Sequence, residues 1–246
     1  MKEIAIVITG TIGKNSNELR KCIESVLTQS VLTKHLLVVD GKEHEEKVKS
    51  TVKEYDSHKD YIDVAVLPYN TGSNGFYAHR IMAAFAHLHD YEYTLYLDED
   101  NWIDCDHVDT QIQNITNNDY LFSHSLRKIF SKEGEFICID DCESLGIYPI
   151  YGEERNGHLV DTSSYCFKTD FLIKVSQLWH KGWGADRSFF SSMMKMKSIE
   201  GRFGGTGYYT LNYRLGGNED SVKSHFFEYG NGYVYSNLKS RPWSKE

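Results

Sequence analysis

The first hundred residues alternate between short apolar runs and amphipathic segments, and this alternation restricts the fold more than any other feature of the chain. The apolar runs are rich in β-branched residues and end near Gly, Pro or Asp, which is typical of buried strands. The segments between them space apolar residues three and four apart, which is typical of helices. The predicted strands are residues 4–9, 36–39, 61–67 and 93–97, and the predicted helices are residues 17–28, 43–55 and 77–88. Such alternation predicts an α/β fold with a mostly parallel central sheet flanked by helices.

Polar residues stand at the ends of all four predicted strands. Thr9, Asp40, Asn70 and Asp98 lie at these ends or just after them. Open parallel sheets bind ligands beyond the carboxyl ends of their strands. We therefore expect the four side chains to converge on one crevice.

The second half of the chain is less regular. Its predicted strands are residues 120–123, 136–139, 159–167 and 208–213, and its predicted helices are residues 170–178 and 185–196. The four glycines of residues 201–207 predict a mobile segment, and residues 216–225 predict a loop that opens a helix. Gly204, Gly205, Gly216 and Gly217 would suit either a lid over a ligand or an ordinary surface loop. No repeat or linker divides the sequence, so we expect a single domain spanning residues 1–246.

Composition excludes several classes of function. The formal net charge of −8 argues against nucleic acid as a partner, because such binding requires a cationic surface. The five irregularly spaced cysteines indicate reduced thiols rather than a disulfide framework, and the chain contains neither a transmembrane-length apolar run nor a signal-peptide core. We therefore expect a soluble, cytoplasmic protein. The tail at residues 236–246 carries Lys239, Arg241, Trp243 and Lys245, which would suit peripheral contact with an anionic membrane surface, although an ordinary solvated tail is favoured.

An Asp-Glu-Asp sequence follows the fourth predicted strand at residues 98–100. Asp98 and Asp100 are two apart, so on an extended chain they would point to the same side. Their carboxylates would repel each other unless a cation lay between them, and hard oxygen ligands suit Mg²⁺ or Mn²⁺. Such an ion could hold a diphosphate and neutralise its charge as it leaves. A solvated acidic turn is the alternative, but the position after a buried strand, in the same crevice as Asp40, favours the metal site.

These segments resemble the family-2-like glycosyltransferases of the GT-A fold. The resemblance is carried by the opening strand with Thr9, the strand ending in VVDG at residues 38–41, LPYNTGSNGFYAHRIMAA at residues 67–84, the Asp-x-Asp after YTLYL, and VDTSSYCFKTDFL followed by GWGADRSFF. It implies a metal-dependent enzyme that transfers a sugar from a nucleotide diphosphate sugar to a hydroxyl acceptor, such as a surface glycan or polysaccharide precursor. Thr9 and Asp40 suit uracil, which favours a UDP-sugar over GDP or dTDP donors. Residues 1–109 would bind nucleotide and metal, and residues 110–246 would bind the acceptor.

The resemblance also implies roles for individual residues. The implied donor-binding residues are Thr9, Asp40, Asn70, Gly72, Arg80 and Asp98. The implied ligands of Mn²⁺ or Mg²⁺ are Asp100 and Asp98, with His225 as a third. Asp186 is implied to be the general base of an inverting enzyme. The chain departs from the family pattern where Ala185 replaces a second acid before the base and where His79-Arg80-Ile81 replaces Ala-Arg-Asn.

Several of these residues have a structural alternative. Asp186 could be an acidic residue favoured at a helix N-terminus, and Asp161 could line the acceptor side or cap its own turn. Trp183 could pack against a sugar ring or belong to the core with Trp179. His225 could complete the metal shell or have a structural role.

Two other functions compete with the transferase. Gly10 and Gly13 after a strand superficially fit an NAD(P)-dependent Rossmann oxidoreductase, but the third glycine is absent. A short-chain dehydrogenase would also need Tyr and Lys four apart, whereas Tyr165 and Lys168 are three apart. A non-catalytic carbohydrate- or nucleotide-binding protein of the same fold is the second alternative, and slow donor hydrolysis with metal would distinguish it from an enzyme.

Overall fold

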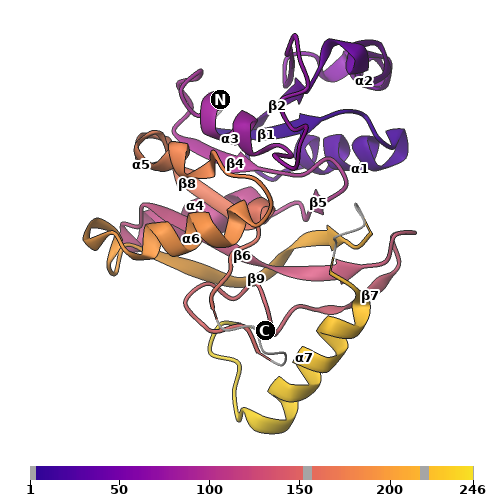
Figure 1. Ribbon diagram of the computed structural model, residues 1–246. Coiled ribbons are helices and arrows are strands. Elements are labelled where there is room, and N and C mark those ends of the chain that lie inside the picture. Colours follow the sequence, from indigo (N-terminus) through magenta and orange to yellow (C-terminus); the bar gives the residue numbers. More distant parts are fainter. Residues whose placement is uncertain (1–3, 152–156, 217–221, 246) are drawn as a thin grey trace.

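A computed structural model describes residues 4–151, 157–216 and 222–245. Their strands form one sheet in the order β3-β2-β1-β4-β8-β6-β9-β5, with β7 paired to β6 (Figure 1). The strands are β1 (Ala5–Thr11), β2 (Thr33–Val39), β3 (Ile62–Val66), β4 (Tyr93–Tyr96), β5 (Trp102–Ile103), β6 (Phe122–Phe130), β7 (Phe136–Ile139), β8 (Tyr165–Lys168) and β9 (Phe203–Arg214). The helices are α1 (Ser16–Leu27), α2 (Glu45–Val52), α3 (His79–Phe85), α4 (His107–Asn118), α5 (Thr169–Val175), α6 (Ala185–Met194) and α7 (Ser224–Asn237).

The first four strands are parallel, as the alternation predicted. β1 pairs with β2 and β4, and β2 pairs with β3. β1 is longer than expected, because its ladder with β2 continues to the pair Thr11 and Val39. The strand therefore ends two residues later than expected, at Thr11, and the cleft is lined by residues that follow Thr9.

Helices cover both faces of this parallel part. Ile6 and Ile8 face the cluster that contains α3, α5 and α6. Ala5 and Val7 face the opposite cluster, to which α1 and α4 contribute, and α2 packs with α1 beside β2. The alternation of side chains along β1 thus serves two cores.

The other half of the sheet is mixed. β8 runs antiparallel to both β4 and β6, whereas β6 and β9 are parallel over a long ladder. α7 packs against this part through Phe226, Phe227 and Val234, together with Leu126 and Tyr209. The apolar face of α7 therefore joins the C-terminal region to the sheet.

The structure corrects three expectations about the second half. α4 was not predicted, and β8 begins only at Tyr165, because residues 162–164 form a short 3-10 helix. The glycine-rich segment is mostly part of β9 rather than a mobile loop. A Cβ on Gly204 would lie 2.8 Å from the Tyr120 ring, and one on Gly205 would lie 3.0 Å from the His124 ring, so close packing requires these glycines. Gly216 lies just after β9, and Gly217 lies outside the described residues.

The C-terminal tail is also anchored rather than simply solvated. Trp243 is buried, and its indole N–H donates to the carboxylate of Asp141 at 2.7 Å. The same carboxylate accepts from Tyr235 Oη at 2.9 Å, from Arg241 Nη1 at 3.1 Å and from the hydroxyl of Tyr209. One buried carboxylate therefore ties the tail to α7 and β9.

Along the described ranges, no helix combines the length and the apolar character that crossing a membrane requires. The five cysteines are free thiols, in agreement with the expectation from their spacing.

Candidate active site

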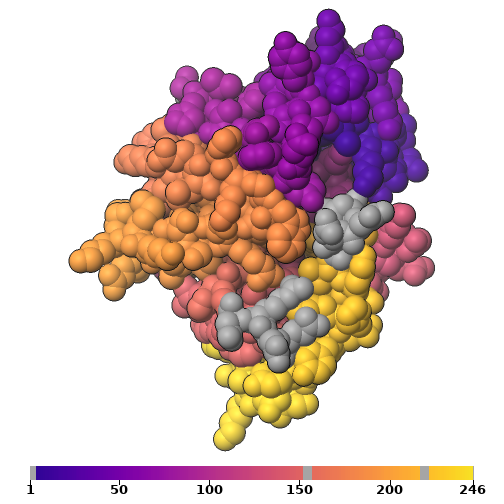
Figure 2. Space-filling view, viewed as in Figure 1, coloured from indigo at the N-terminus to yellow at the C-terminus, as the bar shows by residue number. Residues whose placement is uncertain are grey.

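A cleft of about 1140 Å³ lies at the carboxyl ends of the parallel strands and is lined from both halves of the chain. Its walls include the segment after β1, the loop after β3, the turn after β4, the start of α6 and the start of α7. In the space-filling view the indigo-to-purple N-terminal half lies above the orange and yellow C-terminal half (Figure 2). This volume is large enough to hold two substrates of moderate size.

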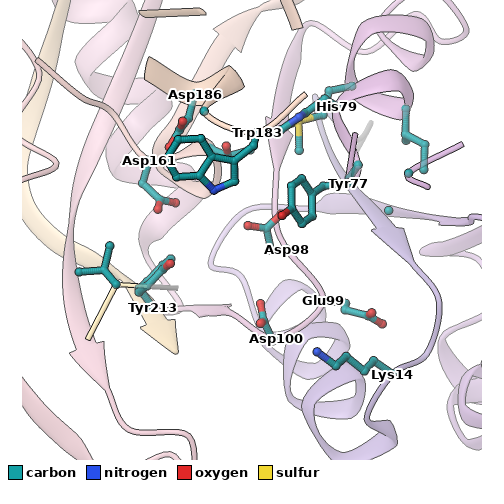
Figure 3. Close-up of a pocket in the computed structure, with 18 of the residues that line it drawn as sticks. Lys14, Tyr77, His79, Asp98, Glu99, Asp100, Asp161, Trp183, Asp186 and Tyr213 are labelled. Atoms are coloured by element: carbon teal, nitrogen blue, oxygen red, sulfur yellow. The ribbon is translucent and has the colours of Figure 1, made fainter. Parts of the chain in front are cut away.

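The acidic residues after β4 form a turn rather than an extended strand. The amide of Asn101 donates to the carbonyl of Asp98 at 3.1 Å, and the amide of Asp98 donates to Ser163 Oγ at 3.1 Å. Asp98 and Asp100 still face the cleft, whereas the side chain of Glu99 turns away from them (Figure 3). Both aspartates therefore face the cleft as expected, but a turn rather than an extended strand places them there.

Glu99 has a separate task, which sequence reasoning missed. Its carboxylate accepts from Thr11 Oγ1 at 2.5 Å and from the amide of Gly13 at 3.0 Å. It thereby fixes the turn after β1, which lines the cleft beside the acidic turn.

The acidic turn carries uncompensated negative charge. Burial raises the pKa of Asp98 well above its usual value, and the nearby Asp100 and Asp161 raise it further. Burial, followed by the charge of Glu99, raises the pKa of Asp100 to about 6. Across the described part of the chain, neither Asp98 nor Asp100 forms an ion pair with a basic side chain. Two crowded carboxylates without a cationic partner fit a divalent cation, because its charge would relieve their repulsion.

A complete set of metal ligands is not assembled. Within residues 4–151, 157–216 and 222–245, no three His, Cys, Asp or Glu side chains are grouped closely enough to hold a metal ion. His225 is exposed and lines the cleft from the first turn of α7. Its role as a third ligand stays a prediction.

Asp40 organises the loop after β3. Its carboxylate accepts from the amide and hydroxyl of Thr71 at 2.7 and 2.8 Å, and from the amide of Gly72 at 2.8 Å. A Cβ on Gly72 would lie 2.4 Å from the carbonyl oxygen of Tyr77, so only glycine fits there. Asp40, Gly72 and Asn70 all line the cleft, and the buried Oδ1 of Asn70 has no protein partner among the described residues.

Thr9 and Arg80 do not reach the cleft. Thr9 shares the face of Ala5 and Val7, and its hydroxyl contacts His35 Nε2 at 3.0 Å, so the expected nucleobase contact does not fit this position. Gly10, Thr11 and Ile12 line the cleft instead. Arg80 donates to the carbonyl of Thr71 at 3.0 Å and stacks on the ring of Phe76, so it braces the loop.

The opposite wall carries the remaining predicted residues. Asp186 lies in the first turn of α6, and its carboxylate accepts from the amide of Arg187 at 2.7 Å. Trp183 is 70% exposed at the edge of the cleft, whereas Trp179 is fully buried, so only Trp183 is available to a ligand. Figure 3 places Asp161, Trp183 and Asp186 across the cleft from Asp98 and Asp100.

A buried ion cluster lies beneath this wall. Arg127 pairs with Asp140 at 2.7 Å, with Glu143 at 2.5 Å and with Asp161 at 2.7 Å, and Glu143 also pairs with Arg187 at 2.7 Å. Burial disfavours the charge on Arg127, but the three carboxylates hold its pKa well above the usual value. The other oxygen of Asp161 accepts from the amide of Ser163, so Asp161 both caps its turn and lines the cleft. Of this cluster only Asp161 was singled out from the sequence; an arginine in the middle of a strand and the neighbouring acids Asp140 and Glu143 were the signals available for the rest.

Comparison with known families provides the decisive observation. The family described as "Glycosyl transferase family 2" matches residues 6–180, which is more than half of the chain. This chain belongs to glycosyl transferase family 2. The family match disfavours the oxidoreductase alternative, as does the complete burial of Tyr165, the tyrosine that alternative would need.

Solved structures identify the fold as GT-A. S. aureus TarS 1-349 in complex with UDP-GlcNAc matches with a TM-score of 0.58 at 12% identity, over 89% of this chain and 60% of that chain. The mannosyltransferase PcManGT from Pyrobaculum calidifontis, in complex with GDP-Man and Mn²⁺, gives 0.57 at 9% identity, over 89% and 59%. GalNAc-T7 with UDP, GalNAc and Mn²⁺ gives 0.60 at 13% identity, over 87% and 44%. The chain thus spans about three fifths of the TarS 1-349 chain. No curated protein sequence matches it.

Proposed function

We propose that this family 2 member is an inverting glycosyltransferase that transfers a sugar from a UDP-sugar to a hydroxyl acceptor. The observation that carries the proposal is the cleft itself, where the unpaired carboxylates of Asp98 and Asp100 face Asp186. One wall then suits a nucleotide diphosphate with its cation, and the other suits a base.

The donor would bind along the N-terminal wall. We assign the nucleoside to the pocket formed by the loop after β3, with Asp40, Asn70 and Gly72, and by residues 10–12. The buried, unpartnered Oδ1 of Asn70 offers a hydrogen-bond acceptor there. The UDP-GlcNAc in the TarS structure and the UDP in the GalNAc-T7 structure support a uridine nucleotide, whereas PcManGT was solved with GDP-Man.

Asp98 and Asp100 would hold Mn²⁺ or Mg²⁺, with His225 as a further candidate ligand from α7. When bound, the ion would neutralise charge on the diphosphate leaving group. The Mn²⁺ in the PcManGT and GalNAc-T7 structures supports this choice.

Asp186 would take the proton from the acceptor hydroxyl. A positioned carboxylate contributes roughly 10²–10⁴-fold by such proton transfer. Because Asp186 lies on the wall across from the acidic turn, the acceptor oxygen would attack the anomeric carbon from the face opposite the diphosphate. That geometry predicts inversion at this carbon.

The acceptor would enter beside Trp183 and Asp161. An exposed indole provides a flat apolar face for a sugar ring, which supports a glycan or polysaccharide precursor as acceptor. Five free thiols favour a reducing compartment, so we propose that the enzyme works in the cytoplasm. Peripheral contact with a membrane would have to involve Lys239 and Lys245, because Arg241 and Trp243 are engaged by Asp141.

A melting-temperature panel of UDP, GDP and their sugars, with and without Mn²⁺, tests the proposal. UDP with Mn²⁺ should raise the melting temperature, because a ligand that binds only the native state stabilises it. Asp100→Ala should abolish this metal-dependent shift, and His225→Ala should weaken Mn²⁺ binding if His225 is a ligand.

Asp186→Asn should keep the shift but lose transfer to acceptor by at least about 100-fold. Absence of any metal-dependent nucleotide binding would refute the donor site, and full activity of Asp186→Asn would reassign the base. Nucleotide binding without any donor hydrolysis in the wild-type protein would instead favour a non-catalytic binding protein.

A further inference from the structure

The loop after β3 carries Tyr77 at the edge of the cleft, and several contacts fix its conformation. Asp40 binds the start of the loop, and the amides of Phe76 and Tyr77 donate to the carbonyl of Gly72 at 3.1 and 3.0 Å. Arg80 adds a stack on Phe76 at 3.5 Å and a hydrogen bond to Thr71. Contacts with Asp40, with Arg80 and within the loop itself therefore fix its conformation.

A second loop, before α6, packs against the loop that carries Tyr77. His79 Nδ1 lies 2.9 Å from the carbonyl of Lys181, and a Cβ on Gly182 would lie 3.4 Å from the carbonyl oxygen of Gly75. The two loops therefore contact each other, and they carry Tyr77 and Trp183 respectively into the same cleft.

Tyr77 itself is held in an unfavourable backbone conformation. Its φ is +51°, in the left-handed region that tyrosine rarely adopts. This conformation is strained for tyrosine and persists only where its surroundings enforce it. The ring makes an edge-on contact with His79, with the ring centroids 5.9 Å apart, yet the side chain stays 39% exposed and lines the cleft. In Figure 3 it extends into the cleft on the side of Asp98, and Trp183 extends from the wall of Asp186.

The charges near this ring are negative. Asp98 and Asp186 form no ion pair with a basic side chain in the described ranges, and the nearby basic group Arg187 is already bound to Glu143. Burial lowers the pKa of His79, which favours its neutral form. Lys14 lies toward Asp100 and Glu99 rather than toward Trp183 (Figure 3). With the proposed cation bound by Asp98 and Asp100, a carboxylate on the sugar would still meet the carboxylate of Asp186 on the other wall.

We propose that Tyr77 is a specificity-determining residue whose ring contacts the transferred sugar, and that this subsite accepts a neutral pyranose and rejects a uronic acid. The inference rests on the proposed donor site and names the sugar class that the site takes. An aromatic face suits the C–H face of a neutral ring, and the carboxylate of Asp186 disfavours an acidic one.

Titration calorimetry with UDP, UDP-glucose, UDP-N-acetylglucosamine and UDP-glucuronic acid, all with Mn²⁺, tests this inference. In the wild-type protein at least one of the two neutral sugars should improve affinity over UDP, and glucuronic acid should not. Tyr77→Gly removes the ring and also relieves the strained backbone, so the melting temperature should be unchanged or higher. In the same variant, the affinity gained from the sugar should fall roughly five- to tenfold. Its affinity for UDP alone should stay within about twofold of the wild-type value.

Two control variants separate the ring from other causes. Tyr77→Phe keeps an aromatic face and should behave like the wild-type protein. Tyr69→Ala removes a tyrosine that is 77% exposed at the start of the same loop and outside the cleft lining, and it should change nothing.

The outcomes distinguish this inference from the proposed function. If UDP with Mn²⁺ does not bind, the proposed function fails and the inference fails with it. If UDP binds but Tyr77→Gly keeps the full gain from the sugar, or glucuronic acid binds as tightly as the neutral sugars, the inference alone is overturned.

Discussion

At the scale of single residues, the site keeps buried charge that the fold alone would not favour. Asp98 and Asp100 are crowded together, and burial raises the pKa of both. A folded-state pKa above the unfolded value means that the folded state binds more protons between the two values. Stability therefore falls as pH rises through that window. For Asp100 the window runs from the usual aspartate pKa of 3.8 to a pKa of about 6 in the folded protein.

Asp100→Asn should consequently stabilise the metal-free protein. The penalty of ionising this carboxylate is fully present at pH 8, so the amide should raise the free energy of unfolding there by about 2–3 kcal/mol. The gain should vanish near pH 3.5, where the carboxyl is protonated in both states. Urea unfolding in EDTA at the two pH values measures this. Asp90→Asn, at an exposed carboxylate, should have no such effect. If Asp100→Asn instead destabilised the protein equally at both pH values, this explanation would be wrong.

At the scale of elements, side chains rather than backbone ladders hold the walls of the cleft in place. Glu99 fixes the turn after β1 and Asp40 fixes the loop after β3. Arg127 on β6 joins the segments that carry Asp140, Glu143 and Asp161. The wall of the cleft that contains Asp161 therefore depends on one buried guanidinium.

Arg127→Met should destabilise the protein by about 3–5 kcal/mol, because it leaves buried carboxylates without their cation. The double variant Arg127→Met with Glu143→Gln should recover part of that loss, since one fewer charge is left unpaired. Chemical denaturation of the single and double variants measures both effects. Arg202→Ala breaks a surface pair with Asp119 and should cost less than about 1 kcal/mol. A loss of similar size in Arg127→Met and Arg202→Ala would refute the importance of burial.

The elements differ in how far the sequence could predict them. The parallel strands were predicted because β-branched runs such as residues 4–9 carry a strong local signal. α4 was missed although its buried residues Val108, Ile112 and Ile115 have helical spacing, because its many Asn and Thr residues have low helix propensity. β9 was partly missed because Gly204 and Gly205 suggest mobility, and only the packing of Tyr120 and His124 explains them.

At the scale of the whole molecule, the cleft belongs to neither half alone. Phe226 and His225 of α7 line it together with residues of the first strands, although α7 packs against the far part of the sheet. The position of α7 depends in turn on Asp141, which binds Tyr235, Arg241 and Trp243. Interactions of the last residues of the described chain are therefore connected to the proposed donor site.

Asp141→Ala should thus affect both stability and binding. Losing an acceptor shared by several buried donors should cost roughly 2–4 kcal/mol and lower the melting temperature by about 5–15 °C. The affinity for UDP with Mn²⁺ should fall by about threefold or more, because the start of α7 is less firmly placed. Calorimetry of unfolding and of binding measures the two effects. Unchanged nucleotide affinity despite the lower melting temperature would show that α7 does not contribute to the donor site.

The site was predictable where motif and strand end coincide, and less so elsewhere. Asp98, Asp100 and Asp40 were expected at the crevice because each follows a buried strand, and the structure brings all three to the cleft, while their roles in binding stay predictions. Thr9 was misplaced, because the length of β1 is set by its pairing with β2 and is not encoded locally. The cluster around Arg127 joins residues that are up to 34 apart in sequence, so only the folded chain reveals it.

The left-handed backbone at Tyr77 has an evolutionary consequence. Glycine, asparagine and aspartate tolerate that conformation better than tyrosine does, and single-nucleotide changes lead from either tyrosine codon to asparagine or aspartate. A population selected in the laboratory only for survival at high temperature would therefore be expected to drift away from tyrosine at this position. Selection that also rewards product formation from a donor with a neutral sugar should retain tyrosine at this position.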